Sequence, residues 1–243
     1  MSGCRANKGK ITAMLILAID TALDACAAAI LDTDDGALRA AESLPMSRGH
    51  AEALMPLIAR VMQTADLSFA ALGRIAVTVG PGSFTGLRVG LSAARGIGLA
   101  ADKPVIGVTT LSAFAAPLLS DSSTTPIVSV IDARHDHVYM QAVRGDGTTL
   151  VRPRVAPIDD VFETARYGEP HLVGNAARQI ADRWPSELPP LAGVDPKPAP
   201  DIAAVAWLAL AADPARSAPR PYYLRPVDAK PQTSGQRLSA PSA

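Results

Sequence analysis

Apolar and polar positions follow one plan that occurs twice along the chain. Near the start, an apolar strand ends at Ile19, a polar turn covers 20–24, and a second apolar run covers 25–31. Much later, a strand that ends at Ile131 leads into a polar turn over 132–136 and a second strand over 137–143. Two such hairpins predict two related halves, and chance similarity of two hairpins is the alternative.

Between the hairpins, strands alternate with helical patterns. The periodicity predicts helices over 49–65 and 83–101, and buried strands over 74–79 and 105–108. Such alternation is typical of an α/β architecture in which helices cover a sheet.

Prolines interrupt the pattern after the second hairpin. Short elements are predicted over 158–165, 171–173 and 176–184, and 202–212 is the last predicted helix. We divide the chain into a disordered leader (1–13), an N-terminal half with the partner-binding helices (14–112), a reduced C-terminal half (113–213) and a proline-rich basic tail (214–243).

The composition excludes several classes of protein. The 243 residues carry 23 basic and 23 acidic side chains, so no net field draws the chain to nucleic acid or to an anionic membrane. Two cysteines are too few for a disulfide framework, which favours a reducing, cytoplasmic location. No apolar run approaches the roughly 20 residues that span a bilayer, so we predict no membrane contact. The leader lacks the apolar core of a signal peptide, and either Met1 or Met14 is the start.

The sharpest motif is the glycine-rich stretch GPGSFTGLRVG at 80–90, between a strand and a helix. Such a turn presents free amides and the positive end of a helix dipole to an anion. Its spacing fits neither a dinucleotide-binding fingerprint, a P-loop nor a nucleophile elbow, so we interpret Ser83 as a helix N-cap. Asp20, Asp24, Asp132 and Asp136 could gather at a cleft between the halves and hold Mg²⁺ on a phosphate, or could simply support their turns. The candidate nucleotide or phosphate residues are Asp20, Thr21, Gly80, Gly82, Ser83 and Asp132.

Small residues recur every four positions along the helix that follows this motif, at Gly86, Gly90, Ala94 and Gly98. Each interior glycine costs a helix about 1 kcal/mol relative to alanine, so the stripe needs a packing reason. The preceding helix has two adjacent apolar faces. Two interpretations stay open, an interface with another chain and a core formed wholly within this one.

Neither a metal site nor a catalytic constellation emerges from the residues. The four histidines are scattered, and the zinc-deaminase pattern suggested by His50 and Glu52 lacks its P-C-x-x-C partner. No nucleophile is paired with a base. We therefore predict no catalytic residue and no metal ligand.

Three segments together resemble one family: 15–22 (LILAIDTA), 80–90, and the Tyr223 to Pro231 region with its YLR and DAKP runs. They are similar to the TsaB (YeaZ-like) family, the dimerisation subunits of bacterial tRNA threonylcarbamoyladenosine synthase. The resemblance implies an actin-like fold, related to sugar kinases and Hsp70, of two similar halves with helices covering mixed sheets. It implies docking to the catalytic paralogue TsaD, or to a second copy when the subunit is alone. The implied interface residues are Leu54, Met55, Ile58, Met62, Gly86, Gly90, Ala94 and Ile97.

The resemblance also bears on cofactors and partners. TsaD holds its metal through an H-x-x-x-H pair, and the matching positions here are Thr110 and Phe114, which are not ligands for a transition metal. The resemblance implies that this chain has no cofactor of its own. It also implies that the complex uses ATP and Mg²⁺, and that TsaD holds the metal. The ATPase TsaE is the implied third subunit. The assembly would meet tRNA, with Arg220, Arg225 and Lys230 as tail contacts.

The leading hypothesis is a non-catalytic scaffold required for threonylcarbamoyl transfer to the adenosine beside the anticodon of ANN-decoding tRNAs. The alternative is an independent nucleotide-binding hydrolase of the actin-like class that uses Asp20 and Asp132, or a peptidase. On the interface hypothesis, we expect Ile58→Asp or Gly90→Arg to break association while the monomer stays folded.

Overall fold

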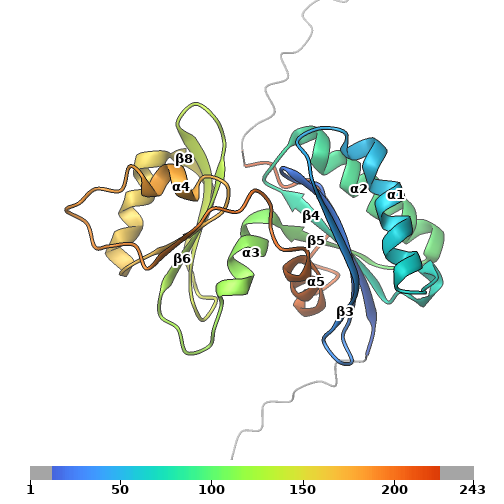
Figure 1. Ribbon diagram of the computed structural model, residues 1–243. Helices are drawn as coiled ribbons and strands as arrows, with labels where there is room; N and C mark the ends of the chain where they lie inside the picture. Colours follow the sequence, from blue (N-terminus) through green and yellow to red (C-terminus); the bar gives the residue numbers. More distant parts are fainter. Residues whose placement is uncertain (1–12, 225–243) are drawn as a thin grey trace, which may run out of the picture.

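The computed structural model describes residues 13–224, which form two halves, each built on a five-stranded mixed sheet (Figure 1). The strand order is β3-β2-β1-β4-β5 in the first sheet and, read from its other edge, β8-β7-β6-β9-β10 in the second. The bounds in the first sheet are β1 (Leu15–Asp20), β2 (Ala25–Asp32), β3 (Leu38–Pro45), β4 (Arg74–Gly80) and β5 (Val105–Thr109). In the second they are β6 (Pro126–Asp132), β7 (His137–Arg144), β8 (Thr149–Pro157), β9 (His171–Val173) and β10 (Gly193–Asp195).

The two sheets confirm the pair of related halves that the repeated hairpins predict. In each sheet the first three strands form an antiparallel meander. The last two strands run parallel to the central strand of the sheet, which is β1 in the first sheet and β6 in the second. The central strands β1 and β6 end at the equivalent residues Asp20 and Asp132. This is the α/β, actin-like architecture expected from the sequence.

Five α-helices and three short 3₁₀ helices surround the sheets within the described residues. The predicted helices of the first half appear within one or two residues of their expected bounds. The α-helices are α1 (His50–Thr64), α2 (Phe84–Ala101), α3 (Thr110–Ala115), α4 (Ala177–Ala181) and α5 (Ile202–Ala211). The 3₁₀ helices are η1 (Phe69–Ala71), η2 (Ala116–Leu118) and η3 (Ile158–Tyr167).

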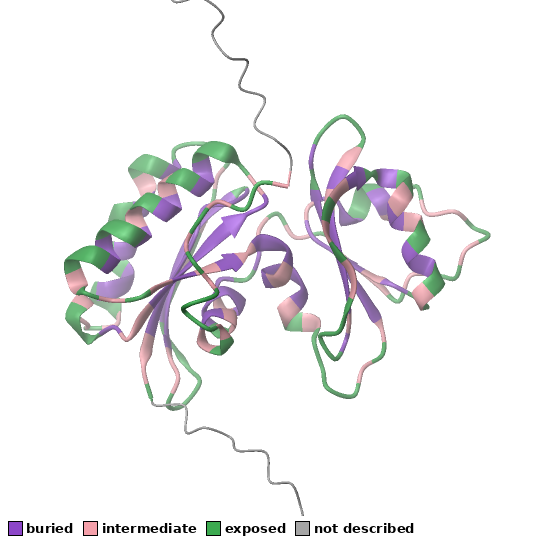
Figure 2. Ribbon diagram, turned by 180° about the vertical axis from the view of Figure 1, so that it is seen from behind, coloured by how far each residue is buried: buried purple, intermediate pink, exposed green. Residues whose placement is uncertain are grey.

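Helices cover both faces of the first sheet. On the outer face, α1 buries a stripe that includes Leu54, Ile58 and Val61, and these side chains share one core with Leu91 and Ile97 of α2. On the inner face, α5 packs on β1, β2 and β4. Figure 2 shows the result, with the central strands of both sheets buried and the outer faces of α1 and α2 exposed.

The second half has its own core and a shared boundary with the first. Its outer face is covered by η3, which packs on β6, β7 and β8, and by α4, which packs on β6, β9 and β10. A further cluster lies between the halves and joins Leu87 of α2 and Phe114 of α3 to Ile131 of β6. In Figure 1, α3 and α5 lie between the two sheets.

The structure departs from the expected division of the chain at its C-terminal end. Helix α5 falls in the stretch 113–213, yet it packs on the first sheet. The segment 217–222, expected as part of the proline-rich basic tail, is bound to the first half: Gly107 N donates to the Ser217 carbonyl (2.8 Å), and Tyr222 N donates to the Val79 carbonyl (2.7 Å). The rest of the expected tail from 225 onward, and the expected leader except residue 13, lie outside the described residues.

Among the described residues, no helix combines the length and the apolar character that crossing a membrane requires.

Candidate functional site: an apolar groove and an occupied glycine loop

The glycine-rich loop joins β4 to α2 at the carboxyl edge of the first sheet. Ser83 is the N-cap of α2, and its Oγ accepts a hydrogen bond from Gly86 N at 3.2 Å. The prediction of an N-cap at Ser83 is therefore confirmed. The exposed side chains of the first helical turn are Phe84 and Thr85.

The turn between β1 and β2 fills the space in front of this loop. Ser83 N donates to the Ala22 carbonyl at 2.7 Å, and Thr21 Oγ1 donates to the Gly86 carbonyl at 2.7 Å. A Cβ atom at Gly82 would lie 2.3 Å from Ala22 O, and one at Gly86 would lie 2.1 Å from Thr21 O. The glycines thus permit close packing of the chain on itself, and the phosphate cradle expected here is occupied by protein backbone.

Asp20 lies inside the protein. Its side chain is fully buried, and Oδ1 accepts hydrogen bonds from Thr78 Oγ1 (2.6 Å) and Ala22 N (3.1 Å). Burial raises the pKa of Asp20, although the Thr78 hydroxyl opposes the shift. Its position is that of a structural carboxyl at the base of a turn.

Asp132, the counterpart of Asp20, is exposed and lines a polar cavity of about 520 Å³ between the halves. Gly82 and Ser83 also line this cavity, whereas Asp20, Thr21 and Gly80 do not. The six candidate phosphate residues therefore separate into three that face the cavity and three that do not. Asp20 is sealed under the β1–β2 turn, which favours the interpretation that it supports its turn over shared Mg²⁺ binding with Asp132.

Sequence reasoning missed part of this cavity. His50 and Arg134 also line it, from the N-terminus of α1 and from the β6–β7 turn. His50 Nε2 lies 3.1 Å from the Leu23 carbonyl. No group of three or more His, Cys, Asp or Glu residues is placed to hold a metal ion in the described part of the chain. Thr110 and Phe114 are buried.

The eight expected interface residues are nearly all in the core. Among them, only Met55 has a side chain with large exposure, at 48%, whereas Ile58 is fully buried and Ile97 is 8% exposed. The remaining residues are buried as well: Leu54, Met62, Gly86, Gly90 and Ala94.

The small-residue stripe of α2 faces the sheet. A Cβ atom at Gly90 would lie 2.4 Å from Thr21 Oγ1, and one at Gly98 would lie 2.4 Å from a methyl group of Val105. The stripe lets α2 lie close to its own strands, so direct contact of these glycines with a partner helix is excluded in this fold. Because Ile58 and Gly90 are both buried, the structure instead predicts that Ile58→Asp and Gly90→Arg destabilise the monomer.

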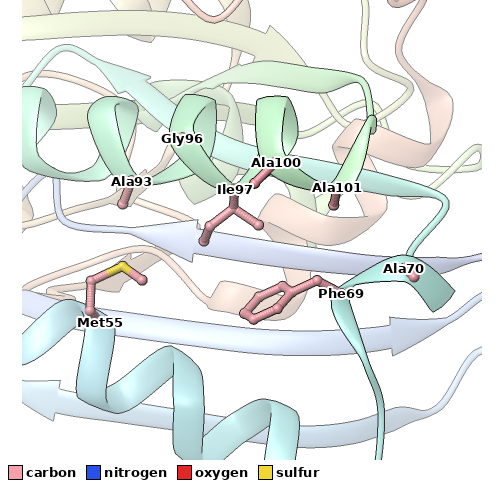
Figure 3. A pocket seen from close by; sticks show the side chains of 8 residues that line it. All are labelled: Met55, Phe69, Ala70, Ala93, Gly96, Ile97, Ala100 and Ala101. Atoms are coloured by element: carbon pink, nitrogen blue, oxygen red, sulfur yellow. The ribbon is translucent and has the colours of Figure 1, made fainter.

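A surface groove nevertheless lies between α1 and α2, on the side away from the sheet. Figure 3 shows Met55 of α1 and Phe69 of η1 facing α2 across a cavity of about 550 Å³. Every lining residue is apolar or glycine: Met55, Phe69, Ala70, Ala93, Gly96, Ile97, Ala100 and Ala101.

A second cavity of about 520 Å³ extends the groove toward the N-terminus of α2. Met55 and Ala93 line both cavities, and Phe84 and Arg88 line the second. The Arg88 guanidinium lies 3.7 Å from the centre of the Phe84 ring, and Tyr223 stacks on the same ring with 5.8 Å between centres. This Arg–Phe–Tyr cluster brings the C-terminal segment next to the groove.

The sequence analysis missed several groove residues, both large ones such as Phe69 and Phe84 and the small residues of α2. Periodicity marks large apolar residues as the functional face, yet here those residues form the core, and Ala93, Gly96 and Ala100 form the surface hollow. A usable signal was Gly96. It lies outside the buried stripe, and an added Cβ there would meet nothing within 4 Å.

Comparison with known proteins finds relatives whose names refer to tRNA modification. Residues 45–194 match the family model described as TsaD, tRNA N6-adenosine threonylcarbamoyltransferase. The Escherichia coli tRNA threonylcarbamoyladenosine biosynthesis protein TsaB is 32% identical over 171 residues, which cover 70% of this chain and 69% of the relative. An uncharacterized Mycobacterium tuberculosis protein is 36% identical over 217 residues, covering 89% of this chain and 94% of the relative.

Solved structures agree with the fold. A Pseudomonas aeruginosa protein described as similar to the peptidase YeaZ has a TM-score of 0.72 and 26% identity, and the match covers 87% of this chain and all of that one. YeaZ from the same organism has a TM-score of 0.69 at 24% identity, with the same coverage.

Proposed function

The chain belongs to the TsaB family, and on this basis we propose that it serves tRNA threonylcarbamoyladenosine biosynthesis as a non-catalytic subunit that docks a TsaD-like transferase. The observation that carries the proposal is the apolar groove between α1 and α2, on the exposed side of the first half. An apolar hollow rimmed by aromatic, methionine and arginine side chains has the composition of a protein interface core.

The shape of the groove favours a helical partner. The α2 side of the groove is formed by the small residues Ala93, Gly96 and Ala100, whose side chains leave the helix backbone close to the surface. The opposite wall is formed by Met55 and Phe69. A helix seated there can approach closely because small side chains reduce the distance between helix axes. The side chains of the partner would then replace water over Ile97.

The choice of partner follows from shared architecture. The family model that matches this chain is that of TsaD, so TsaD contains a domain of related fold. Two related domains can pair through equivalent helices, as the two copies of a symmetric dimer do. The same face would serve a homodimer of the isolated subunit and a heterodimer with TsaD.

Three features support a non-catalytic role. The glycine loop is filled by the β1–β2 turn, Asp20 is buried, and the resemblance matches the TsaD metal ligands to Thr110 and Phe114, whose side chains do not bind a transition metal. On this proposal, ATP and Mg²⁺ serve the complex through its other subunits, TsaE is the third subunit, and the metal stays in the partner. Threonylcarbamoyl transfer then takes place on tRNA in the cytoplasm.

A charge placed in the groove tests the proposal. We expect Met55→Glu to weaken binding to the TsaD-like subunit by about tenfold or more, because the carboxylate would lose its water in an apolar interface. Met55 is half exposed, so the substitution leaves the core intact. Leu119→Glu is the matched control, since Leu119 is 40% exposed and does not line the groove. Isothermal calorimetry with equal affinities for the native chain and Met55→Glu would contradict the groove assignment.

The polar cavity between the halves supports a second candidate, nucleotide binding. Its walls carry Asp132, Arg134 and His50, which suit a small charged ligand. Calorimetry with ATP and Mg²⁺ decides the matter: tight binding that Asp132→Ala abolishes, together with turnover, would favour a nucleotide hydrolase. Absence of binding heat would remove that candidate.

A further inference from the structure

A cluster of arginines surrounds a cavity in the second half, far from the α1–α2 groove. The cavity has a volume of about 300 Å³ and lies between β8 and η3. Arg152 and Arg154 alternate with apolar neighbours on β8 and so share one face of that strand, and Arg166 comes from η3. We call this site the arginine pocket.

The charges in the arginine pocket are unequally paired. Arg154 Nη1 lies 3.3 Å from Asp160 Oδ2, so that pair is neutral. Arg166 Nη2 donates to the Tyr167 hydroxyl at 2.8 Å, which leaves its charge uncompensated. Arg152 makes no ion pair or side-chain hydrogen bond among residues 13–224. The lining carries three arginines against Asp160 and Glu163, which leaves a net charge of plus one in a chain whose total charge is zero.

Part of the pocket is ordered by internal contacts. The Tyr167 hydroxyl donates to the Leu150 carbonyl at 3.4 Å, which ties η3 to β8. The Arg166 guanidinium lies 4.8 Å from the centre of the Tyr167 ring. Tyr167 thereby holds Arg166 beside β8, and the two unpaired guanidiniums present several N–H donors in planar arrays that match phosphate oxygens.

We infer that the arginine pocket binds a phosphate group of RNA. The inference rests on the proposed function, because an RNA-modifying assembly meets many phosphates. The position of the site supports it. In Figure 1, β8 lies in the half opposite to α1 and α2, so a partner docked on the groove leaves the pocket open to tRNA. An arginine–phosphate contact adds affinity without reading sequence.

The test measures binding of an unmodified tRNA transcript to the complex of this chain with the TsaD-like subunit, by fluorescence anisotropy at several salt concentrations. We expect Arg152→Gln with Arg166→Gln to weaken binding about tenfold or more, and to reduce the slope of log affinity against log salt by about one to two. Arg178→Gln is the matched control. Arg178 is exposed in the same half, on α4 and outside the pocket, and its removal should leave both quantities unchanged.

Each outcome has one meaning for the inference. If the double variant still assembles and its tRNA affinity and salt slope equal those of the native chain, the arginine pocket does not bind RNA, although the docking proposal stands. If the double variant and Arg178→Gln lose affinity equally, the effect is general charge and the inference fails. Polyglutamate distinguishes the other occupant. If the double variant loses polyglutamate binding but keeps its tRNA affinity, the pocket serves an acidic protein partner and the inference fails.

Discussion

At the scale of single residues, the glycines of α2 divide into those that pack against the chain and one that faces the groove. Gly90 has Thr21 Oγ1 where a Cβ would be placed, while Gly96 has open space. We expect Gly90→Ala to lower the free energy of unfolding by about 1–3 kcal/mol through overpacking. Gly96→Ala should raise the free energy of unfolding by about 0.5–1 kcal/mol, because alanine gives the unfolded chain less backbone freedom than glycine does. Urea unfolding of both variants checks this, and equal effects would contradict the packing described for α2.

The buried carboxyl of Asp20 links stability to pH. Because burial raises its pKa above the ordinary value of 3.8, the folded protein favours the neutral acid. The stabilisation is complete below pH 3.8 and is lost as the pH rises through the raised folded-state value. Asp20→Asn removes this dependence while its Oδ1 still accepts from Thr78.

Urea unfolding between pH 4 and pH 8 measures this effect. The stability of Asp20→Asn relative to the native chain should increase as the pH rises above 3.8 toward the raised folded-state pKa of Asp20. Asp24→Asn, a change of the same kind at an exposed position of the same turn, serves as the control. Parallel pH profiles for the native chain and Asp20→Asn would show that Asp20 is ionised inside the protein.

At the scale of elements, a single arginine holds the C-terminal end of α5 against the first sheet. Arg74 Nη1 donates to the carbonyls of Ala209 (2.6 Å), Leu210 (3.3 Å) and Ala212 (3.2 Å). A cation at this end of a helix also meets the negative end of the helix dipole.

We expect Arg74→Met to cost about 1–3 kcal/mol of unfolding free energy, since partly buried carbonyls would lose a charged donor. Arg88→Met, which changes a guanidinium on the exposed Phe84 ring, should cost much less. Thermal and urea unfolding measure the stability of both variants. Equal destabilisation by the two substitutions would contradict this assignment.

The elements also show how far sequence patterns reach. The inner strands and the long helices α1 and α2 follow from apolar periodicity, whereas β3 and β8 do not. Both are edge strands, so one side of each is unpaired and carries fewer large apolar residues. β8 contains Pro153, and a proline in a sequence pattern predicts the end of a strand, although an edge strand tolerates proline.

The candidate site was only partly predictable for a similar reason. Periodicity indicates which residues of α1 and α2 are apolar, but not which of two apolar faces turns toward the sheet. Thr21 and the strands below select the glycine stripe for close packing, and this contact joins residues distant in sequence. The surface hollow then falls on Ala93 and Gly96, which have no strong apolar signal.

At the scale of the whole molecule, the duplicated sheets are visible in sequence from a few matched positions around Asp20 and Asp132. The return of the chain from the second half to the first is not visible in the sequence. Helix α5 and the segment 217–222 return from the second half to the first, held by long-range contacts that no local pattern encodes. The molecule thereby presents separate surfaces, a groove on one half, a polar cavity between the halves and an arginine pocket on the other.

The most direct measurement is formation of threonylcarbamoyladenosine on tRNA. The TsaD-like and TsaE-like subunits are supplied with ATP, threonine, bicarbonate and the adenylate-forming enzyme, with and without this chain. We expect product only when this chain is present, none when it replaces the TsaD-like subunit, a strong loss with Met55→Glu and native yield with Leu119→Glu. Equal product in the presence and absence of the native chain would contradict its role as a required docking subunit.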